Sequence, residues 1–173
     1  INYLKNNMPT INLSQSAYDE LKDHFCGKTE KTDWNVLHMK PEYTAQYLFD
    51  ECKKLFDCYT WFDLDSVTSD RHGEYTVTFK PNVEADEENK NKSANDVKGL
   101  KTITLPERLL LELNYFKATG KHLDIVNITL CAGSRSHAGN VPRVSWHDLQ
   151  VNVYYCGPDD GYGDIRTRSA VSP

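Results

Sequence analysis

The residue types best suited to recognition or catalysis are concentrated in the last third of the chain, between Leu130 and Ser169. Arginines, histidines and aromatic side chains lie there among short apolar runs and Gly/Pro turns. Arginine, tryptophan and tyrosine are the usual anchors of binding surfaces, because each combines a large contact area with directional polar groups. We therefore expect a ligand-binding region that contains Arg135, Arg143, Trp146, Tyr155, Arg166 and Arg168.

The arginines at the end of this region allow two interpretations. Arg166 and Arg168 alternate along a predicted strand, so their side chains are expected on one face. Guanidinium groups near aromatic rings suit an anionic small ligand, a nucleotide or an acidic protein surface. Alternatively, the same arginines form ion pairs with nearby aspartates and only hold the C-terminal strand in place. The expected partners in that case are Asp159, Asp160 and Asp164.

Two histidines are candidate catalytic bases. His147 is followed by Asp148, and His137 lies three residues after Ser134. The chain has no GxSxG elbow, no phosphate-binding GxxxxGK[ST] loop and no strand-linked GxGxxG. Most histidines in proteins are simply hydrogen-bonded surface or core residues. The sequence therefore favours a non-catalytic binding protein, with a small enzyme acting on a phosphate-containing or nucleic-acid substrate as the alternative.

No pattern predicts a metal or a cofactor. The stretch from Asp159 to Asp164 resembles a calcium loop in composition but lacks the twelve-residue ligand pattern and its terminal glutamate. The chain has five cysteines and no CxxC pair, which favours reduced, mostly buried thiols. Cys131 and Cys156 each end an apolar run, and the sequence leaves open whether they are neighbours. A zinc site that they share with a histidine lacks the usual ligand spacing.

The charge of the chain limits its partners. The formal net charge is −5 and the pI is about 5.7, which argues against non-specific binding to nucleic acid. The sequence contains no run of eighteen apolar residues and starts without a secretory h-region. We expect a cytoplasmic protein, with Met8 as a candidate first residue and no membrane contact. The expected partner is a protein or an anionic small ligand.

Three helices are predicted. The first follows a cap at Ser16 and ends at Gly27, and the second begins near Pro41 and carries an apolar face as far as Phe56. The third has the strongest local signal, because a capping box at 104–107 includes Pro106 at the first turn. Its apolar residues continue to a stop at Gly120.

The predicted strands lie mostly in the C-terminal half. Residues 59–64 and 75–79 suit an antiparallel hairpin, and period-two patterns follow at 125–130, 143–146 and 151–155. The expected architecture is a single α+β domain over 8–173, with about three helices packed on a mainly antiparallel sheet. Residues 82–99 lack aromatic side chains and apolar periodicity, which predicts a solvated, mobile loop.

Three segments of the C-terminal half resemble a group of small uncharacterised proteins from bacteriophages, mobile elements and poorly cultured bacteria. The segments are TLPERLLLELNYFKATGKHLDI, TLCAGSRSHAGNVPRVSWHD and VYYCGPDDGYGDIRTRSAVS. The shared pattern is a leucine-rich helix, then T-L-C-x-G-S-R, V-P-x-V-x-W and R-x-R-S-A-V, and it covers roughly residues 102–172. The resemblance implies a protein of mobile-element character in the host cytoplasm or the virion, and it implies no particular activity.

Overall fold

The longest helix, α3 (Leu105–Thr119), is buried on nearly every side and organises the fold. The Thr104 side chain accepts from the Glu107 amide, and the Glu107 carboxylate accepts from the Thr104 amide. This capping box confirms the predicted start of the helix, and Gly120 at φ 67° confirms its end. The structure is a computed structural model that describes residues 33–171, so the helix predicted after Ser16 lies outside the described residues.

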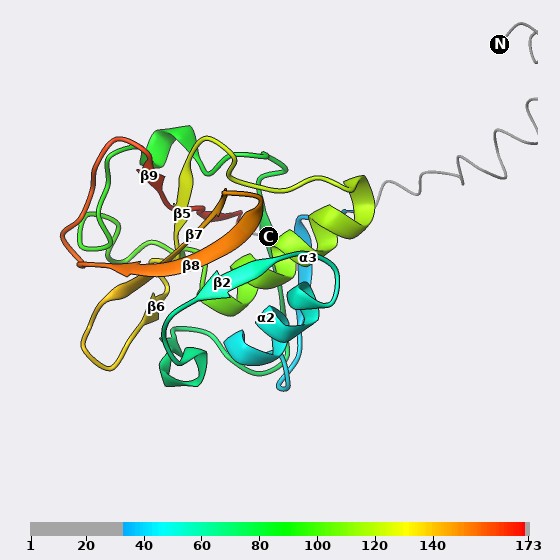
Figure 1. Ribbon diagram of the computed structural model, residues 1–173. Coiled ribbons are helices and arrows are strands. Elements are labelled where there is room, and N and C mark those ends of the chain that lie inside the picture. Colours follow the sequence, from blue (N-terminus) through cyan, green and yellow to red (C-terminus); the bar gives the residue numbers. More distant parts are fainter. Residues whose placement is uncertain (1–32, 172–173) are drawn as a thin grey trace, which may run out of the picture. The chain divides into compact units, whose positions relative to one another are not determined.

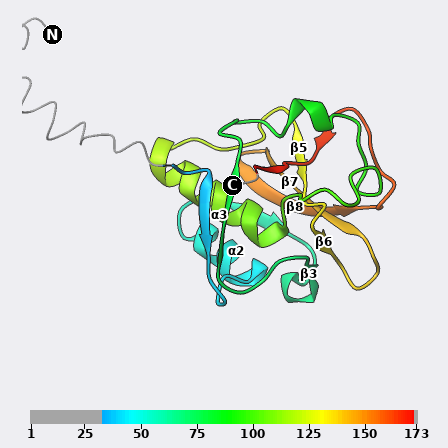
Figure 2. The same ribbon diagram turned by 180° about the vertical axis from the view of Figure 1, so that it is seen from behind.

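Two sheets lie on either side of α3, as the opposite views in Figures 1 and 2 show. A three-stranded antiparallel sheet has the order β1-β4-β10. A five-stranded sheet has the order β2-β8-β7-β5-β9, in which β2 and β9 are parallel to their neighbours. The strands of the first sheet are β1 (Val36–Met39), β4 (Tyr75–Phe79) and β10 (Ala170–Val171). Those of the second are β2 (Cys58–Thr60), β5 (Ile128–Leu130), β7 (Val141–His147), β8 (Gln150–Cys156) and β9 (Ile165–Arg166).

Shorter elements complete the described part of the chain. The helix α2 (Ala45–Lys53) packs beside α3, and it is capped by the Thr44 side chain rather than starting at Pro41. Two 3-10 helices, η1 (Leu64–Ser66) and η2 (Glu87–Asn89), lie in the connections. The strands β3 (Thr68–Ser69) and β6 (Ser134–Arg135) form a separate antiparallel pair.

The main core confirms the α+β class. It joins apolar side chains of both sheets to α2 and α3, including Phe79 of β4 and Val153 of β8. The described residues contain two α-helices, and most strand pairs are antiparallel and C-terminal. None of the helices in this part of the chain is long and apolar enough to cross a membrane.

The hairpin predicted for residues 59–64 and 75–79 is wrong. β2 pairs in parallel with β8, whereas β4 pairs with β1 and β10 in the other sheet. Local patterning identifies strands but not their partners, because each apolar face can pack against any complementary layer. The predicted strand at 125–130 is also shorter, since only Ile128–Leu130 pairs and the residues before it form a loop.

The hairpin of β7 and β8 confirms the predicted strands at 143–146 and 151–155. His147 pairs with Gln150, and the two residues between them, Asp148 and Leu149, have φ values of 52° and 62°. Two successive residues with positive φ match the twist of a two-residue β-hairpin turn.

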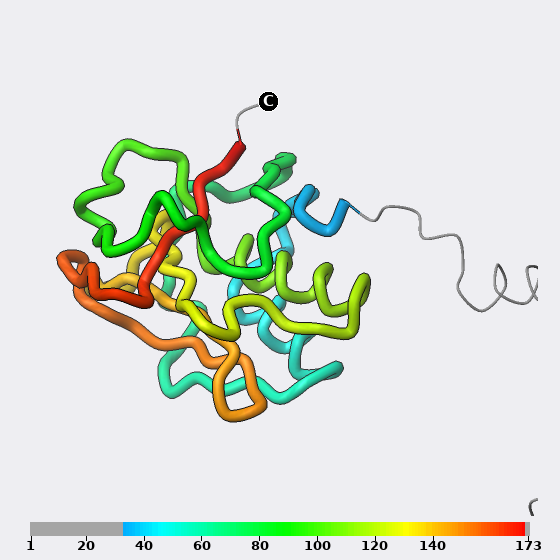
Figure 3. Tube along the Cα trace, turned by 90° about the horizontal axis from the view of Figure 1, so that it is seen from above, coloured from blue at the N-terminus to red at the C-terminus, as the bar shows by residue number. Residues whose placement is uncertain are grey.

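Residues 82–99 are packed against the domain and are not the solvated loop that their composition predicts. Ala85, Asn89, Ala94 and Val97 are 2–3% exposed. Figure 3 shows this segment beside the C-terminal strands, where the Asn89 side chain donates to the Thr167 carbonyl and the Ser169 hydroxyl. Small apolar and amide side chains bury well between neighbouring segments although they show no periodicity.

Candidate functional site

The outer face of the five-stranded sheet carries the candidate site. Side chains alternate along β7 and β8, so Val144 and Val153 face the core while Arg143 and Tyr154 lie opposite each other on the outer face. The Arg143 guanidinium carbon lies 5.5 Å from the centroid of the Tyr154 ring. This geometry is that of a cation–π contact, which holds the guanidinium in one place on the sheet.

A groove of about 320 Å³ surrounds this pair. Its walls come from the hairpin β7–β8, from the loop before β5 and from the residue before β9. Besides Arg143 and Tyr154, the lining residues are Ile125, Val126, Asn127, Ile128, Ser145, Trp146, His147, Asn152 and Asp164. The groove therefore combines aromatic and amide groups with one guanidinium, one imidazole and one carboxylate.

Arg143 differs from the other described arginines in its lack of polar partners. Arg71, Arg108, Arg166 and Arg168 each pair with a carboxylate. Arg143 forms no ion pair within residues 33–171, and its buried Nε has no hydrogen-bond partner there. The Nη1 and Nη2 donors of Arg143 also form no hydrogen bond within these residues and are not fully buried, so an incoming acceptor can reach them. Arg143 is thus the group in the groove best placed to receive an anionic oxygen.

Asn152 fixes the floor of the groove. It is 3% exposed, and its Nδ2 donates to the carbonyls of His147 and Gln150 at 2.8 and 3.2 Å. Its Oδ1 accepts from the Gln150 side chain at 3.1 Å and from the Tyr154 hydroxyl at 3.4 Å. The amide therefore ties the β7–β8 turn to the Tyr154 ring, on which Arg143 lies.

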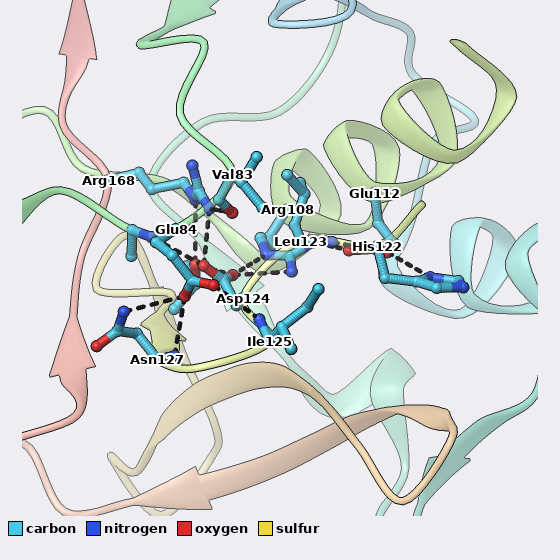
Figure 4. Close-up of polar contacts among 12 residues, drawn as sticks. Val83, Glu84, Arg108, Glu112, His122, Leu123, Asp124, Ile125, Asn127 and Arg168 are labelled. Carbon is cyan, nitrogen blue, oxygen red and sulfur yellow. Dashed lines mark hydrogen bonds and ion pairs between the residues drawn. The ribbon is translucent and has the colours of Figure 1, made fainter. Parts of the chain in front are cut away.

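The loop that forms one wall is held by a carboxylate from the segment 82–99. Glu84 accepts from the backbone amides of Ile125, Val126 and Asn127 at 2.9–3.1 Å, and from the Asn127 side chain at 3.0 Å. Figure 4 shows Glu84 with its dashed lines to this loop. Ile125 and Val126 remain 58% and 77% exposed at the rim. The loop thus presents apolar side chains while its backbone is anchored.

A buried network of charged residues supports this wall from inside. Asp124 lies between two arginines, with Arg108 Nε donating to its Oδ2 at 3.0 Å and Arg168 Nη2 donating to its Oδ1 at 2.7 Å (Figure 4). Its oxygens also accept from the Ala85 amide and the Thr129 hydroxyl. Every hydrogen-bonding position of Asp124 is therefore occupied, as a fully buried charge requires.

The network extends through Glu112 to Trp146, a groove-lining residue whose place in β7 puts its ring on the same face as Val144, against the main core. Arg108 Nη1 donates to Glu112 Oε2 at 2.7 Å, and Glu112 Oε1 lies 2.9 Å from Nδ1 of His122. The His122 ring stacks on Trp146 with centroids 3.5 Å apart and planes inclined by 5°. The orientation of Trp146 is thus linked to the buried charges by a single histidine.

The structure brings only part of the predicted binding region together. Arg143 and Trp146 line the groove, whereas Arg166 and Arg168 are 9% and 0% exposed and lie elsewhere. Their expected partners are wrong, since Arg166 pairs with Glu87 and Arg168 with Asp124. Glu87 belongs to the segment 82–99, which the sequence pattern assigned to solvent, whereas Asp124 lies in the loop after α3.

The remaining predicted binding residues also serve the fold. Arg135 Nη1 donates to the carbonyls of Ala132 and Ser134, outside the groove. The Tyr155 ring stacks on Phe62 with centroids 3.6 Å apart. Burial of the Tyr155 side chain raises its pKa. Neither residue lies beside Arg143 in the groove lining.

The two candidate bases have different surroundings. His147 lines the groove, and its Nε2 lies 3.4 Å from Asp148 Oδ1, with both side chains exposed. His137 is exposed on the loop after β6. Ser134 is 1% exposed, and its hydroxyl contacts the Leu105 amide and the Ser69 hydroxyl at 2.9 and 2.7 Å. The Ser134 hydroxyl therefore braces β6 against α3.

The aspartates and cysteines behave as structural groups. Asp160 accepts from the Gly157 amide at 2.6 Å, as expected for an aspartate in a turn. Within residues 33–171, no group of three or more histidine, cysteine or acidic side chains could hold a metal ion. Cys131 and Cys156 are free thiols, and burial raises the pKa of Cys156 to about 11.

Sequence reasoning missed several groove residues. Tyr154, Asn152 and the pair Ile125–Val126 were expected only as strand residues. The available signal was the register of the β7–β8 hairpin, because a two-residue turn at 148–149 places Arg143 opposite Tyr154. No pattern in the sequence near Glu84 predicts its contacts with the loop 125–127.

The structure is an α+β fold with a groove lined by polar and aromatic residues on its larger sheet. In comparisons with known proteins, no family model, no curated protein and no solved structure matches the chain.

Proposed function

We propose that this chain is a non-catalytic binding protein, of phage or mobile-element character, that recognises a protein partner through the groove around Arg143. The partner presents a carboxylate that reaches the guanidinium. One observation carries the proposal: Arg143 lies against Tyr154 without any polar partner in the described residues, in a groove of about 320 Å³. An arginine–aromatic pair is a typical energetic centre of a protein interface.

The surroundings of the groove favour a protein over a nucleic acid. Apolar side chains are exposed around it, with Ile125 and Val126 on one wall and Leu149, at 81% exposure, on the adjacent hairpin turn. Asp164 also lines the groove, and a carboxylate there repels a continuous phosphate backbone. The net charge of −5 acts in the same direction.

A titration with a short leucine-rich peptide that carries a single glutamate tests this proposal, with amide NMR shifts as the measurement. The groove residues should shift on addition of this peptide, and a peptide with glutamine in place of glutamate should bind more weakly. Arg143→Gln should weaken binding of the glutamate peptide by at least about tenfold, the equivalent of about 1.4 kcal/mol. Lys98→Gln, the same loss of charge at an exposed turn residue, is the matched control and should bind as the parent chain does.

Equal binding by the parent chain and Arg143→Gln would refute the proposal.

A second function, an enzyme acting on a phosphate-containing substrate, is favoured by the position of His147 in the same groove as Arg143. In that function His147 is the base and Arg143 holds the anion. The enzyme predicts turnover of a nucleotide or an oligonucleotide that disappears in His147→Ala, whereas the binding protein predicts no turnover in either chain.

A further inference from the structure

A second cavity, on a different part of the domain, has a volume of about 390 Å³. Its walls come from the loop between β1 and α2, from the segment η1–β3 and from the loop before β4, next to the α2 and β3 labels of Figure 2. It shares no lining residue with the groove around Arg143. The volume falls within the range of roughly 300–1,000 Å³ that is usual for small-molecule sites.

The interior of this cavity is mainly apolar. Met39, Ala45 and Leu64 are 4%, 5% and 1% exposed and line it, together with the half-buried Val67 and Tyr75. An apolar lining of this kind favours a ligand with a hydrocarbon or aromatic body, because burial of apolar surface is the main driving force of binding.

One guanidinium at the cavity is held rigidly. Arg71 donates through Nε and Nη2 to the two carboxylate oxygens of Glu107 at 2.8 and 2.7 Å, and through Nη2 to the Thr102 carbonyl. The Tyr75 hydroxyl donates to Glu107 at 2.9 Å, and the Thr104 amide donates at 2.8 Å. Glu107 is fully buried and has two donors on each oxygen, so its role is to position Arg71.

The third nitrogen of Arg71 is available to a ligand. Nη1 makes no hydrogen bond within the described part of the chain, and the Arg71 side chain is 17% exposed. Because Nε and Nη2 fix the plane of the guanidinium, the direction of the two Nη1 donors is also fixed. A donor whose direction is set in advance binds an oxygen acceptor with little loss of conformational entropy.

The charges at the cavity favour an anion. Lys40 also lines it and forms no ion pair with any described residue, while Nζ lies 5.7 Å from the centroid of Tyr43. The first turn of α2, a nine-residue helix, contributes Thr44 and Ala45 to the lining, and the N-terminus of a helix carries partial positive charge. Asp65 is the one carboxylate among the described lining residues.

We propose that this cavity binds a small molecule with an apolar body and a single anionic head, a carboxylate or a phosphate. The head accepts from Nη1 of Arg71 and lies near Lys40, and the body occupies the space over Met39 and Leu64. The site is independent of the Arg143 groove, so either assignment can fail without the other.

Amide NMR titrations of the full chain with four simple probes test the proposal. Benzoate and phenyl phosphate carry the proposed body and head, benzyl alcohol lacks the charge, and inorganic phosphate lacks the body. Benzoate or phenyl phosphate should shift the amides of cavity residues and bind at least about tenfold more tightly than benzyl alcohol and inorganic phosphate. The stronger of the two anions identifies the head group. The site is refuted if benzyl alcohol binds as tightly as the anions, if inorganic phosphate alone binds as tightly as phenyl phosphate, or if no cavity residue shifts.

Three variants separate the head from the body. Lys40→Glu should weaken the binding of benzoate and phenyl phosphate by about tenfold without changing the binding of benzyl alcohol. Lys98→Glu, its matched control, should bind all probes as the parent chain does. Arg71→Lys should likewise weaken the binding of the two anionic probes relative to that of benzyl alcohol. Because Arg71 also serves the fold, Val67→Trp provides a test that leaves the ion pair intact, since the larger ring fills the cavity and should abolish binding of all probes. Unchanged binding in Val67→Trp would place the ligand elsewhere.

Discussion

Asp124 and Arg168, 44 residues apart in the sequence, form an ion pair that is almost completely shielded from solvent. Arg168 also donates to the carbonyls of Asn82 and Val83, and Asp124 also binds Arg108. Two cations share one carboxylate, and Glu112 supplies the second negative charge through Arg108. The C-terminal segment, the start of segment 82–99 and helix α3 are therefore joined by one buried set of charges (Figure 4).

Asp124→Asn should lower the free energy of unfolding by about 3–5 kcal/mol, because it leaves Arg108 and Arg168 with one carboxylate between them. Asparagine tolerates the positive φ of 53° at this position, so the effect reports the charge rather than the backbone. The measurement is chemical denaturation at neutral pH. Glu87→Gln removes the carboxylate partner of Arg166 at a position whose side chain is 71% exposed, and should cost less than about 1 kcal/mol. Equal effects of the two variants would show that the buried pair contributes no more than the exposed one.

Arg168→Gln and Arg143→Gln should have opposite effects on stability and binding. Arg168 is buried in the charge network, so its loss should lower the melting temperature strongly and leave binding of the glutamate peptide per folded molecule unchanged. Arg143 lacks a carboxylate, so its loss should weaken binding while costing about 1 kcal/mol or less of stability from the contact with Tyr154. Denaturation and peptide titration of both variants provide the measurement. Weakened binding in Arg168→Gln alone would place the functional site at the C-terminus.

Those parts of the fold that depend on short-range signals follow from the sequence. The capping box at Thr104 and the positive-φ glycine at 120 define α3 within a few residues of each end. The alternation around Val144 and Val153 and the turn at 148–149 define the central hairpin. Each of these signals acts between neighbouring residues, where the chain's own geometry limits the alternatives.

Long-range partners could not be predicted in the same way. Nothing near β2 shows that it adds to β8 in parallel, and nothing near Glu84 shows that its carboxylate binds three backbone amides of another loop. Arg143 and Arg168 look alike in the sequence, yet one lacks a partner and the other is buried between carbonyls and Asp124. Local composition records neither burial nor distant neighbours, so it selected Arg143 and Trp146, which line the groove, together with Arg135, Arg166 and Arg168, which do not.

Glu84→Ala should destabilise the loop 124–127 although the residue lies in a segment of polar composition. The variant removes the acceptor of four hydrogen bonds, three of them from backbone amides, and should cost about 1–3 kcal/mol. Hydrogen exchange should become faster at the amides of residues 125–127. Glu88→Ala, in which the lost carboxylate contacts only the exposed Lys80, should leave exchange at this loop unchanged. Identical exchange in Glu84→Ala and the parent chain would mean that the carboxylate does not anchor the loop.

The buried carboxyl of Asp86 predicts a specific dependence of stability on pH. Burial raises its pKa; Glu88 acts in the same direction, while the hydrogen bond from the Ser169 amide and the charges of Lys80 and Arg168 oppose it. A carboxyl with a raised pKa in the folded state binds protons more tightly there than in the unfolded chain. Its contribution to stability therefore falls as the pH rises from about 4 through the raised pKa. Asp86→Asn removes this loss, so its stability relative to the parent chain should increase over the same pH range. A relative stability that declines with rising pH would contradict the assignment.

Thiol reactivity provides a test of the core. Burial raises the pKa of Cys58 to about 12 and that of Cys156 to about 11, and it also raises the pKa values of the fully buried Cys52 and Cys131. At pH 8 a thiol with a pKa of 11 is ionised in only about one molecule in a thousand. A Cys26→Ser variant, which removes the cysteine outside the described residues, should therefore react with Ellman's reagent very slowly when folded. In guanidinium chloride all four thiols of the same variant should react rapidly with the reagent, because unfolding exposes them to solvent. A rapid reaction of one thiol in the folded protein would contradict this prediction. It would show that one of these four cysteines is more accessible to solvent than its place in or next to β2, α2, β5 or β8 indicates.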